Sequence, residues 1–268
     1  MGIPYAEVIG DPIAQSKSPV IHNFWLRKLG LVGEYRATKV ASGELEAYLA
    51  ERRADPDWRG CNITMPLKQD AVHRVDVIEG RMERIGAINT IVPRGGMLIG
   101  TNTDTTGMLE ALIAARVPGP PVVIVGAGGA ARAICLALSS YEPEMIVLNR
   151  DVAKAGRMIA DLGIRADARG LDAPLPGAGL LVNASALGMR GHPAFPLPLD
   201  PLPADAVVID IVTDPIDTAL LAAARARGLR AIDGLVMLTG QAAAAFAMFF
   251  GNEAPRQHDD ALRRLLTS

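Results

Sequence analysis

Residues 121–133, PVVIVGAGGAARA, are the part of the chain that says most about its fold. A run of four valine and isoleucine residues leads directly into a glycine-rich turn, and a helical pattern begins after it. Gly126, Gly128 and Ala131 have the spacing G-x-G-x-x-A that is typical of dinucleotide-binding turns. Alone this spacing is a weak signal, because ordinary strand-to-helix turns are also rich in glycine. The strand before it, the helix after it and a second strand at residues 145–149 favour dinucleotide binding.

The small residues of the turn have distinct physical roles. Gly126 permits a tight turn, Gly128 lacks the Cβ that would block a pyrophosphate, and Ala131 lets helix and strand pack closely. The phosphates are expected at the N–H groups of the helix N-terminus. The predicted cofactor contacts of this loop are Gly126, Ala127, Gly128, Gly129 and Ala130.

The end of the second strand bears on which dinucleotide is bound. NAD sites usually have an Asp or Glu about 20 residues beyond the glycines, where it holds the ribose 2′-hydroxyl. Here Asn149 stands at that place, followed by Arg150 and Lys154, two cations that can meet a 2′-phosphate. Asp151 argues for NAD, although it is also the expected N-cap of a helix over residues 152–162. The sequence favours NADP and leaves NAD possible.

Composition restricts the class of protein. Half of the 268 residues are apolar, and 27 basic and 29 acidic residues give a net charge of −2. Because no run of Lys and Arg is longer than a pair, we do not expect nucleic acid as a partner. The longest apolar run, residues 242–250, is too short to span a bilayer, so no membrane partner is expected. Two cysteines in unrelated contexts predict a cytoplasmic protein without a metal site.

Strands and helices are expected to alternate in the first hundred residues. Ser18 and Pro19 are the expected N-cap and first residue of a helix that ends at Gly30, Ser42 is the expected cap of a second helix, and Pro66 opens a third. The expected strands are residues 6–10, 34–40, 59–64, 87–92 and 97–101, the last two forming a hairpin and an antiparallel edge.

The alternation continues through the second half of the chain. Strands are expected at residues 122–125, 145–149, 180–183, 206–211 and 229–232, and helices at residues 104–115, 152–162, 218–227, 241–250 and 258–266. This succession predicts an α/β protein, in which a mixed-sheet α/β unit is followed by a Rossmann-type doubly wound sheet.

Two polar motifs interrupt the apolar pattern. In residues 62–68, NITMPLK, alternate side chains are polar, and Lys68 falls in the first turn of the expected helix, where it opposes the helix dipole. Stability therefore does not explain this lysine, although most lysines are simply exposed to solvent. Asp104 lies where a strand leads into a helix, a position that by itself is more typical of a cap than of a catalyst.

Several motifs, in order along the chain, resemble the signatures of the shikimate dehydrogenase family. They are GDPI at residues 10–13, SKSP at 16–19 with His22-Asn23, N-x-T-x-P-x-K at 62–68, GAINT at 86–90, NTD-x-x-G at 102–107, NAS with GM at 183–189, and DG with ML and QA at 233–242. Chance agreement of so many ordered motifs is very improbable.

The resemblance implies a role for each matching residue. Ser16 and Ser18 are expected to hold a substrate carboxylate, and Lys68 and Asp104 to form the catalytic pair. Removal of a hydride from a secondary alcohol also requires removal of the hydroxyl proton, which a lysine held by an aspartate can accept. The residues expected to bind ring hydroxyls are Thr64, Asn89 and Gln241, and those expected to bind the cofactor beyond the glycine loop and residues 149–154 are Ala184, Gly234 and Met237.

The resemblance also implies a domain plan. Residues 1–103, joined by the C-terminal helices of residues 240–268, are the expected substrate-binding and catalytic domain. Residues 104–239 are the expected NADP-binding domain. The expected assembly is a monomer or a homodimer.

Three departures from the family pattern leave alternatives open. Gln15 stands where the family usually has His, Thr213 replaces the Tyr that reaches the substrate carboxylate, and Asp151 stands where NADP-using members often have Thr. The favoured function is reversible, NADP-dependent hydride transfer between 3-dehydroshikimate and shikimate. The alternatives are a divergent paralogue that acts on quinate or another ring acid with NAD or NADP, and a non-catalytic sensor of ring acids. Retention of both Lys68 and Asp104 argues against the sensor.

Overall fold

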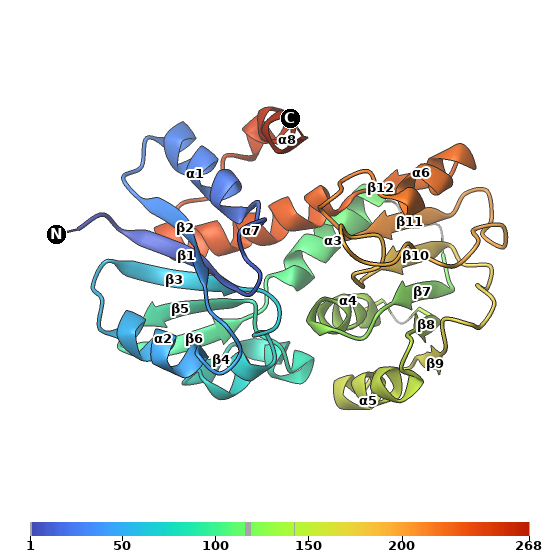
Figure 1. The fold of residues 1–268 in the computed structure, drawn as a ribbon, viewed down its shortest axis with the longest axis horizontal. Coiled ribbons are helices and arrows are strands. Elements are labelled where there is room, and N and C mark those ends of the chain that lie inside the picture. Colours follow the sequence, from blue (N-terminus) through green and yellow to red (C-terminus); the bar gives the residue numbers. More distant parts are fainter. Residues whose placement is uncertain (1, 116–118, 142, 268) are drawn as a thin grey trace. The chain divides into compact units, whose positions relative to one another are not determined.

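The computed structural model, drawn in Figure 1, describes residues 2–115, 119–141 and 143–267. The chain divides into two compact units by its internal contacts. The first consists of Met1–Thr103 with Gln241–Ser268, and the second of Asp104–Gly240. Each contains a six-stranded sheet flanked by helices, which confirms the predicted α/β fold class.

The first unit contains a mixed sheet. Its strands are β1 Tyr5–Gly10, β2 Glu34–Lys39, β3 Trp58–Ile63, β4 Val77–Ile78, β5 Thr90–Arg94 and β6 Met97–Thr101, in the spatial order β2-β1-β3-β5-β6-β4. β1, β2 and β3 are parallel, whereas β5 is antiparallel to β3 and to β6. The predicted hairpin is therefore present, but its antiparallel strand lies inside the sheet. The edge is formed by β4, which is too short to be recognised from the sequence.

Helices cover both faces of this sheet. They are α1 Ser18–Leu29, α2 Leu45–Arg53, α7 Gly234–Phe250 from residue 241 onward and α8 Asp259–Thr267, with 3-10 helices η1 Asp70–His73, η2 Gly80–Ile85 and η3 Arg256–His258. Ala6 and Val8 of β1 pack in a cluster with Phe249 of α7, and Tyr5 and Ile9 pack in a cluster with residues of α2. This alternation follows from the two-residue period of a strand.

The two predicted serine caps are wrong. Lys17 occupies the N-cap position of α1, and Ser18 is already helical. The reason is that Ser16 lies close enough for its Oγ to accept the Ser18 N–H at 3.3 Å, so the helix begins one residue earlier. At α2 the N-cap is Glu44, whose carboxylate instead accepts the Ala41 N–H at 2.8 Å.

The prediction of a helix that begins at Pro66 is also wrong, so Lys68 does not lie in the first turn of a helix. A turn follows β3, and only η1 is helical before residue 75. The Lys68 carbonyl accepts the N–H of Ile88 at 2.8 Å, and the N–H of Val72 bonds instead to Gln69. An α-helix needs the carbonyl of residue 68 for the N–H of residue 72, so this tertiary bond prevents it.

The second unit contains a parallel sheet of the predicted doubly wound type. Its strands are β7 Val122–Val125, β8 Met145–Leu148, β9 Asp167–Arg169, β10 Leu180–Asn183, β11 Val207–Asp210 and β12 Arg230–Ile232. Their spatial order is β12-β11-β10-β7-β8-β9. All strands are parallel, but successive strands are added on one side of β7 up to β9 and on its other side from β10 onward, which is the arrangement of dinucleotide-binding sheets. The helices are α3 Asp104–Ala115, α4 Gly129–Ser139, α5 Val152–Leu162, α6 Ala219–Ala226 and the first part of α7. Sequence analysis does not find the three-residue β9.

Candidate active site

The carboxyl ends of β1, β3 and β6 lie at one edge of the first sheet, because these strands run in the same direction. β5 runs the other way and enters the sheet at this edge. Polar residues at the carboxyl ends of strands are the usual source of ligand sites in α/β sheets. The predicted substrate and catalytic residues that lie next to these strand ends are Ser16, Ser18, Thr64, Lys68 and Asn89.

The two serines follow β1 at the start of α1. Ser18 is buried and Ser16 is half-buried, with the Ser16 Oγ bonded to the Ser18 backbone N–H. A helix N-terminus carries partial positive charge and attracts carboxylates. The chemistry of this helix start therefore suits the acid group of a ligand.

Thr64 lies directly beyond β3 and close to the end of β1. Its N–H bonds to the Ile9 carbonyl at 2.9 Å. A Cβ added to Gly10 would approach the Thr64 methyl group and the Met65 carbonyl oxygen to 2.6 Å. Glycine at position 10 thus allows β1 to end against Thr64, which is half-buried.

Three buried polar side chains form the centre of this edge. Asn89 Oδ1 accepts the Thr103 backbone N–H at 2.7 Å, and Asn89 Nδ2 donates to Thr103 Oγ1 at 3.0 Å. Thr103 Oγ1 donates to Oε1 of Gln241 at 3.3 Å. Residues that are far apart in the sequence are therefore held together by hydrogen bonds, which is the expected state of buried polar groups.

Lys68 is bonded to a chain neighbour of this network, and Asp104 is itself such a neighbour. The carbonyl of half-buried Lys68 accepts the N–H of Ile88, the neighbour of Asn89. Asp104 is 5% exposed and is the first residue of α3, immediately after Thr103. By the division into units, Lys68 belongs to the first and Asp104 opens the second.

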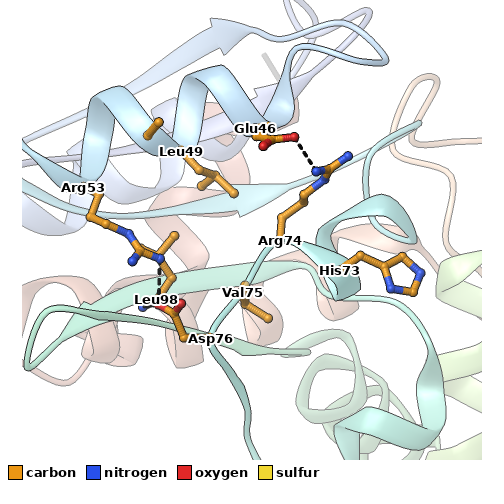
Figure 2. A pocket seen from close by; sticks show the side chains of 9 residues that line it. Glu46, Leu49, Arg53, His73, Arg74, Val75, Asp76 and Leu98 are labelled. Atoms are coloured by element: carbon orange, nitrogen blue, oxygen red, sulfur yellow. Dashed lines mark hydrogen bonds and ion pairs between the residues drawn. The ribbon is translucent and has the colours of Figure 1, made fainter.

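A separate pocket lies away from these strand ends. It has a volume of about 510 Å³ and is lined by Glu46, Leu49, Ala50, Arg53, His73, Arg74, Val75, Asp76 and Leu98. Figure 2 shows its arginines turned toward acidic partners, Arg53 toward Asp76 and Arg74 toward Glu46. Leu98 lies near the beginning of β6, whereas the polar cluster lies beyond its end at Thr101. This pocket contains none of the predicted site residues.

The glycine loop of the second unit fits a dinucleotide. Gly126 has a φ of +121°, and a Cβ there would lie 2.7 Å from the Ala184 carbonyl oxygen. Gly128 is different, because no described atom outside its immediate surroundings lies within 4 Å of its Cβ position. Gly128 is the N-cap residue of α4, and the first N–H groups of a helix have no partner within it. The open space beside these donors fits a pyrophosphate.

The small residues around Gly128 complete this loop. Ala127 is buried, and Gly129 and Ala130 are the first, half-buried residues of α4. Ala131 is fully buried against the sheet, as expected from the fingerprint. The Gly126 N–H bonds to the Leu148 carbonyl at 2.8 Å, which places the turn beside the end of β8.

The residues predicted to select the dinucleotide lie together beyond β8. Asp151 is the N-cap of α5, and its Oδ1 accepts the Lys154 N–H at 2.9 Å, which confirms its predicted capping role. Asn149 is half-buried and donates from Nδ2 to the Asp151 carbonyl at 2.8 Å. Arg150 and Lys154 are exposed. The Arg150 and Lys154 side chains are therefore exposed to solvent, next to an Asp151 carboxylate that is engaged in capping α5.

Three further predicted cofactor residues lie after the neighbouring strands. Ala184 follows β10, and its N–H bonds to the Val125 carbonyl at 2.8 Å. Gly234 is the first residue of α7, and a Cβ there would meet the Ile211 carbonyl oxygen at 2.5 Å. Met237 is buried in the first part of α7, and Thr213 is half-buried beyond β11. Helix α7 thus begins seven residues before its predicted start at Gln241.

Sequence reasoning missed residues that support the predicted site residues within each unit. Thr90 and Thr103 lie within the quoted motifs but were given no role, although buried threonines at the ends of apolar strands are a usable signal. Asp210 is fully buried and accepts bonds from Asn183, Val212 and Thr218. Burial raises the pKa of its carboxyl group above its usual value.

Residues 2–115, 119–141 and 143–267 contain no group of three or more His, Cys, Asp or Glu side chains placed to hold a metal ion. Within the same residues, no helix has both the length and the apolar character needed to cross a bilayer. Cys61 and Cys135 are both buried and unbridged.

Comparison with known proteins identifies the family. The model of a protein family described as "Shikimate dehydrogenase substrate binding domain" matches residues 8–91. A shikimate dehydrogenase (NADP(+)) of Sphingopyxis alaskensis is 53% identical over 267 residues, which cover 99% of this chain and 97% of the relative. Another, from Methylocella silvestris, is 46% identical and covers 98% of this chain and 95% of the relative.

A solved structure agrees with these relatives. Shikimate 5-dehydrogenase from Thermus thermophilus, in complex with NADP(H) and shikimate, has a TM-score of 0.89 and 37% identity, covering 98% of this chain and 100% of that one. The similarity in sequence and in structure thus extends over both units. The chain belongs to the shikimate dehydrogenase family.

Proposed function

We propose that this chain is an NADP-dependent shikimate dehydrogenase, an oxidoreductase that interconverts shikimate and 3-dehydroshikimate. The observation that carries this function is the 53% identity, over 99% of the chain, to a shikimate dehydrogenase (NADP(+)). The reaction belongs to the biosynthesis of chorismate and the aromatic amino acids. The three departures at Gln15, Asp151 and Thr213 therefore occur within a shikimate dehydrogenase.

The first unit is the proposed substrate-binding and catalytic domain. Ser16 and Ser18, at the N-terminus of α1, hold the carboxylate, where the helix dipole assists them. Asn89 and Gln241 bind ring hydroxyls from the buried network around Thr103. Thr64 supplies a further hydroxyl contact from the end of β3.

Lys68 and Asp104 are the proposed catalytic pair. Oxidation of a secondary alcohol removes a hydride from carbon and a proton from oxygen, and reduction of the ketone returns both. In this proposal Lys68 exchanges the proton with the substrate oxygen, and Asp104 holds the lysine in place. NADP, when bound, supplies the nicotinamide that accepts or returns the hydride.

The second unit is the proposed NADP-binding domain. The N–H groups at the start of α4, beside Gly128, receive the pyrophosphate, and Arg150 and Lys154 receive the 2′-phosphate. Asn149 contacts the same ribose without the negative charge that would repel that phosphate. The remaining proposed contacts are Ala127, Gly129, Ala130, Ala184, Gly234 and Met237.

Two properties are proposed beyond the chemistry. The two buried, unbridged cysteines support a cytoplasmic location. The proposed substrate and cofactor residues come from a single chain, so a monomer or a homodimer suffices. Size-exclusion chromatography with light scattering distinguishes the two, and a larger assembly would contradict both.

A steady-state matrix tests the function directly. Shikimate and quinate are each assayed with NADP and with NAD, in one buffer and at one salt concentration. We expect the highest kcat/KM with shikimate and NADP. Preference for quinate with NAD would overturn the proposal in favour of the paralogue, and ligand binding without turnover of any pair would indicate a sensor.

A further inference from the structure

A series of buried hydrogen bonds connects Tyr35, a residue with no assigned role, to Asn89 in the buried polar network. The Tyr35 hydroxyl donates to Oδ1 of Asn62 at 2.5 Å. Asn62 Nδ2 donates to Oγ1 of Thr90 at 2.9 Å, and Thr90 donates to Oδ1 of Asn89 at 2.9 Å. Tyr35, Asn62 and Thr90 are each at most 5% exposed. The line therefore runs inside the first unit, from β2 to the entrance of β5.

We propose that Tyr35 is a positioning residue for the substrate-binding amides. It acts through the Asn62 amide and the Thr90 hydroxyl, which together orient Asn89. This inference rests on the proposed function, since Asn89 is one of the residues assigned to the ring hydroxyls. Tyr35 itself touches neither substrate nor cofactor in this proposal.

The donor and the acceptor in the bond between Tyr35 and Asn62 can be assigned from the groups around them. Asn62 faces the backbone carbonyl of Asn89 at 3.3 Å, and because a carbonyl only accepts, the facing atom is the amide nitrogen. The Asn62 oxygen then points at Tyr35. Burial raises the pKa of Tyr35 well above its usual value, so the phenol keeps its proton and donates. The 2.5 Å bond from Tyr35 is the shorter of these two restraints on the Asn62 amide.

The direction continues along the line. Thr90 receives the Asn62 N–H and therefore gives its own proton to Asn89 Oδ1, which also accepts the Thr103 backbone N–H. The Asn89 nitrogen thus faces Thr103 Oγ1, whose own proton is within reach of two acceptors, Asn89 Oδ1 and Gln241 Oε1, each at 3.3 Å. The orientation of the Asn89 amide is therefore fixed by a series of bonds that begins at Tyr35.

Two consecutive residues of α1 hold Tyr35 in place. Asn23 bonds to both the N–H and the carbonyl of Tyr35, at 3.0 and 2.7 Å. The His22 ring stacks on the Tyr35 ring, with centroids 3.9 Å apart and planes within 6°. Neither ring nitrogen of His22 has a hydrogen-bond partner among the described residues. His22 therefore serves as a flat apolar surface, and the His22-Asn23 pair gains a physical role.

The sheet explains why a tyrosine is needed at position 35. β1 lies between β2 and β3, so Tyr35 and Asn62 are separated by two strand spacings, about 10 Å, across the strands. Asn62 is also displaced by two residues along the strand, because it pairs with Val8 whereas Tyr35 pairs with Ala6. Tyr35 pairs in register with Ala6 of β1, whose small side chain leaves room for a ring to cross. A long, rigid side chain with a terminal hydroxyl can bridge this distance.

The experiment compares Tyr35→Phe with Tyr48→Phe. The first removes the hydroxyl and keeps the stacking. The second removes another buried tyrosine hydroxyl of the same unit, which donates to Glu7 at 2.6 Å outside the line. We expect Tyr35→Phe to raise KM for shikimate roughly threefold to tenfold, the net worth of one hydrogen bond, with kcat and KM for NADP unchanged. Tyr48→Phe should lower the melting temperature and leave all three constants unchanged.

A second variant, Thr90→Val, breaks the line one step further on and decides the question if Tyr35→Phe does not fold. We expect the same selective rise in KM, and in the double variant no additional rise, because the two residues act in series. A folded Tyr35→Phe or Thr90→Val with wild-type KM, or additive effects, would overturn the inference. Failure of the proposed function looks different, because the wild-type protein itself would then not oxidise shikimate.

Discussion

Lys68 is the residue on which the proposed chemistry depends most directly. Lys68→Ala is expected to lower kcat by roughly two orders of magnitude or more, the usual scale of general acid-base catalysis. NADP binding, measured by fluorescence titration, should be unchanged, because the proposed cofactor contacts lie in the second unit. Near-wild-type turnover at saturating shikimate would remove Lys68 from the mechanism.

Asp104 is tested beside Lys68. Its alternative role is structural, because a carboxylate in the first turn of α3 also stabilises this helix through its interaction with the helix dipole. We expect Asp104→Asn to lower kcat while the melting temperature changes little. A variant that loses stability but keeps its kcat would assign Asp104 to the helix alone.

Arg150 is the residue expected to distinguish NADP from NAD. Arg150→Ala should raise KM for NADP by roughly tenfold, as for one lost charge-assisted hydrogen bond, and change KM for NAD little. Arg165→Ala is the matched control, because it removes the same charge beyond the other end of α5, where the residue is also exposed. Equal changes for both cofactors, or equal changes in both variants, would contradict phosphate recognition by Arg150.

At the scale of elements, the turn from β7 to α4 contains two glycines that are needed for different reasons. Gly128→Ala should leave the melting temperature nearly unchanged, because its φ of −94° suits alanine and its Cβ position is open. The same methyl group should raise KM for NADP by roughly tenfold or more, since it occupies the space proposed for the pyrophosphate.

Gly126→Ala provides the comparison. Its positive φ and the 2.7 Å approach to Ala184 should destabilise the fold itself by about 1–3 kcal/mol. Thermal unfolding and NADP titration of both variants check these expectations. If Gly128→Ala binds NADP as well as the wild type, the open space beside α4 is not the phosphate site.

At the scale of the whole molecule, stability should decrease toward acid. Burial lowers the pKa of His22 to about 3, from 6.5 in the unfolded chain. Below pH 6.5 the unfolded chain gains a proton that the folded protein does not, so stability falls by up to about 1.4 kcal/mol per pH unit. Urea unfolding between pH 7.5 and 5 measures this slope. His22→Phe should abolish it and exposed His73→Gln should keep it, and an unchanged slope in His22→Phe would exclude His22 as the cause.

Two buried carboxylates modify this trend at lower pH. Burial tends to raise the pKa of Glu7, but bonds from Arg52, Thr38 and Tyr48 outweigh it and lower the pKa below 4.5. Glu7 therefore stabilises the fold above pH 4.5, and this stabilisation is lost as pH falls through its folded pKa. Asp210 acts in the opposite sense, because its pKa is raised above 3.8 and its ionised form is disfavoured in the folded state. For this reason the slope is best measured above pH 5, where His22 dominates.

Local chemistry by itself determined the fold class, the glycine loop and most of the strands. An apolar run that ends in G-x-G-x-x-A requires a strand, a tight turn and a helix, and the structure has each of them at residues 122–139. Asp151 was predictable as a cap for the same reason, since a cap depends only on its next few neighbours. The proposed roles of the site residues came from a resemblance between ordered motifs, and they stay predictions until the variants are measured.

Other features depend on distant partners and could be seen only once the fold was known. The helix expected after Pro66 is absent because Ile88 takes the carbonyl that it requires, and the sheet edge is a strand of two residues. The bond from Tyr35 to Asn62 crosses an intervening strand and has no signature in the chain. Sequence patterns report periodicity and neighbours within a few residues, whereas these features depend on which strands pair and in which register.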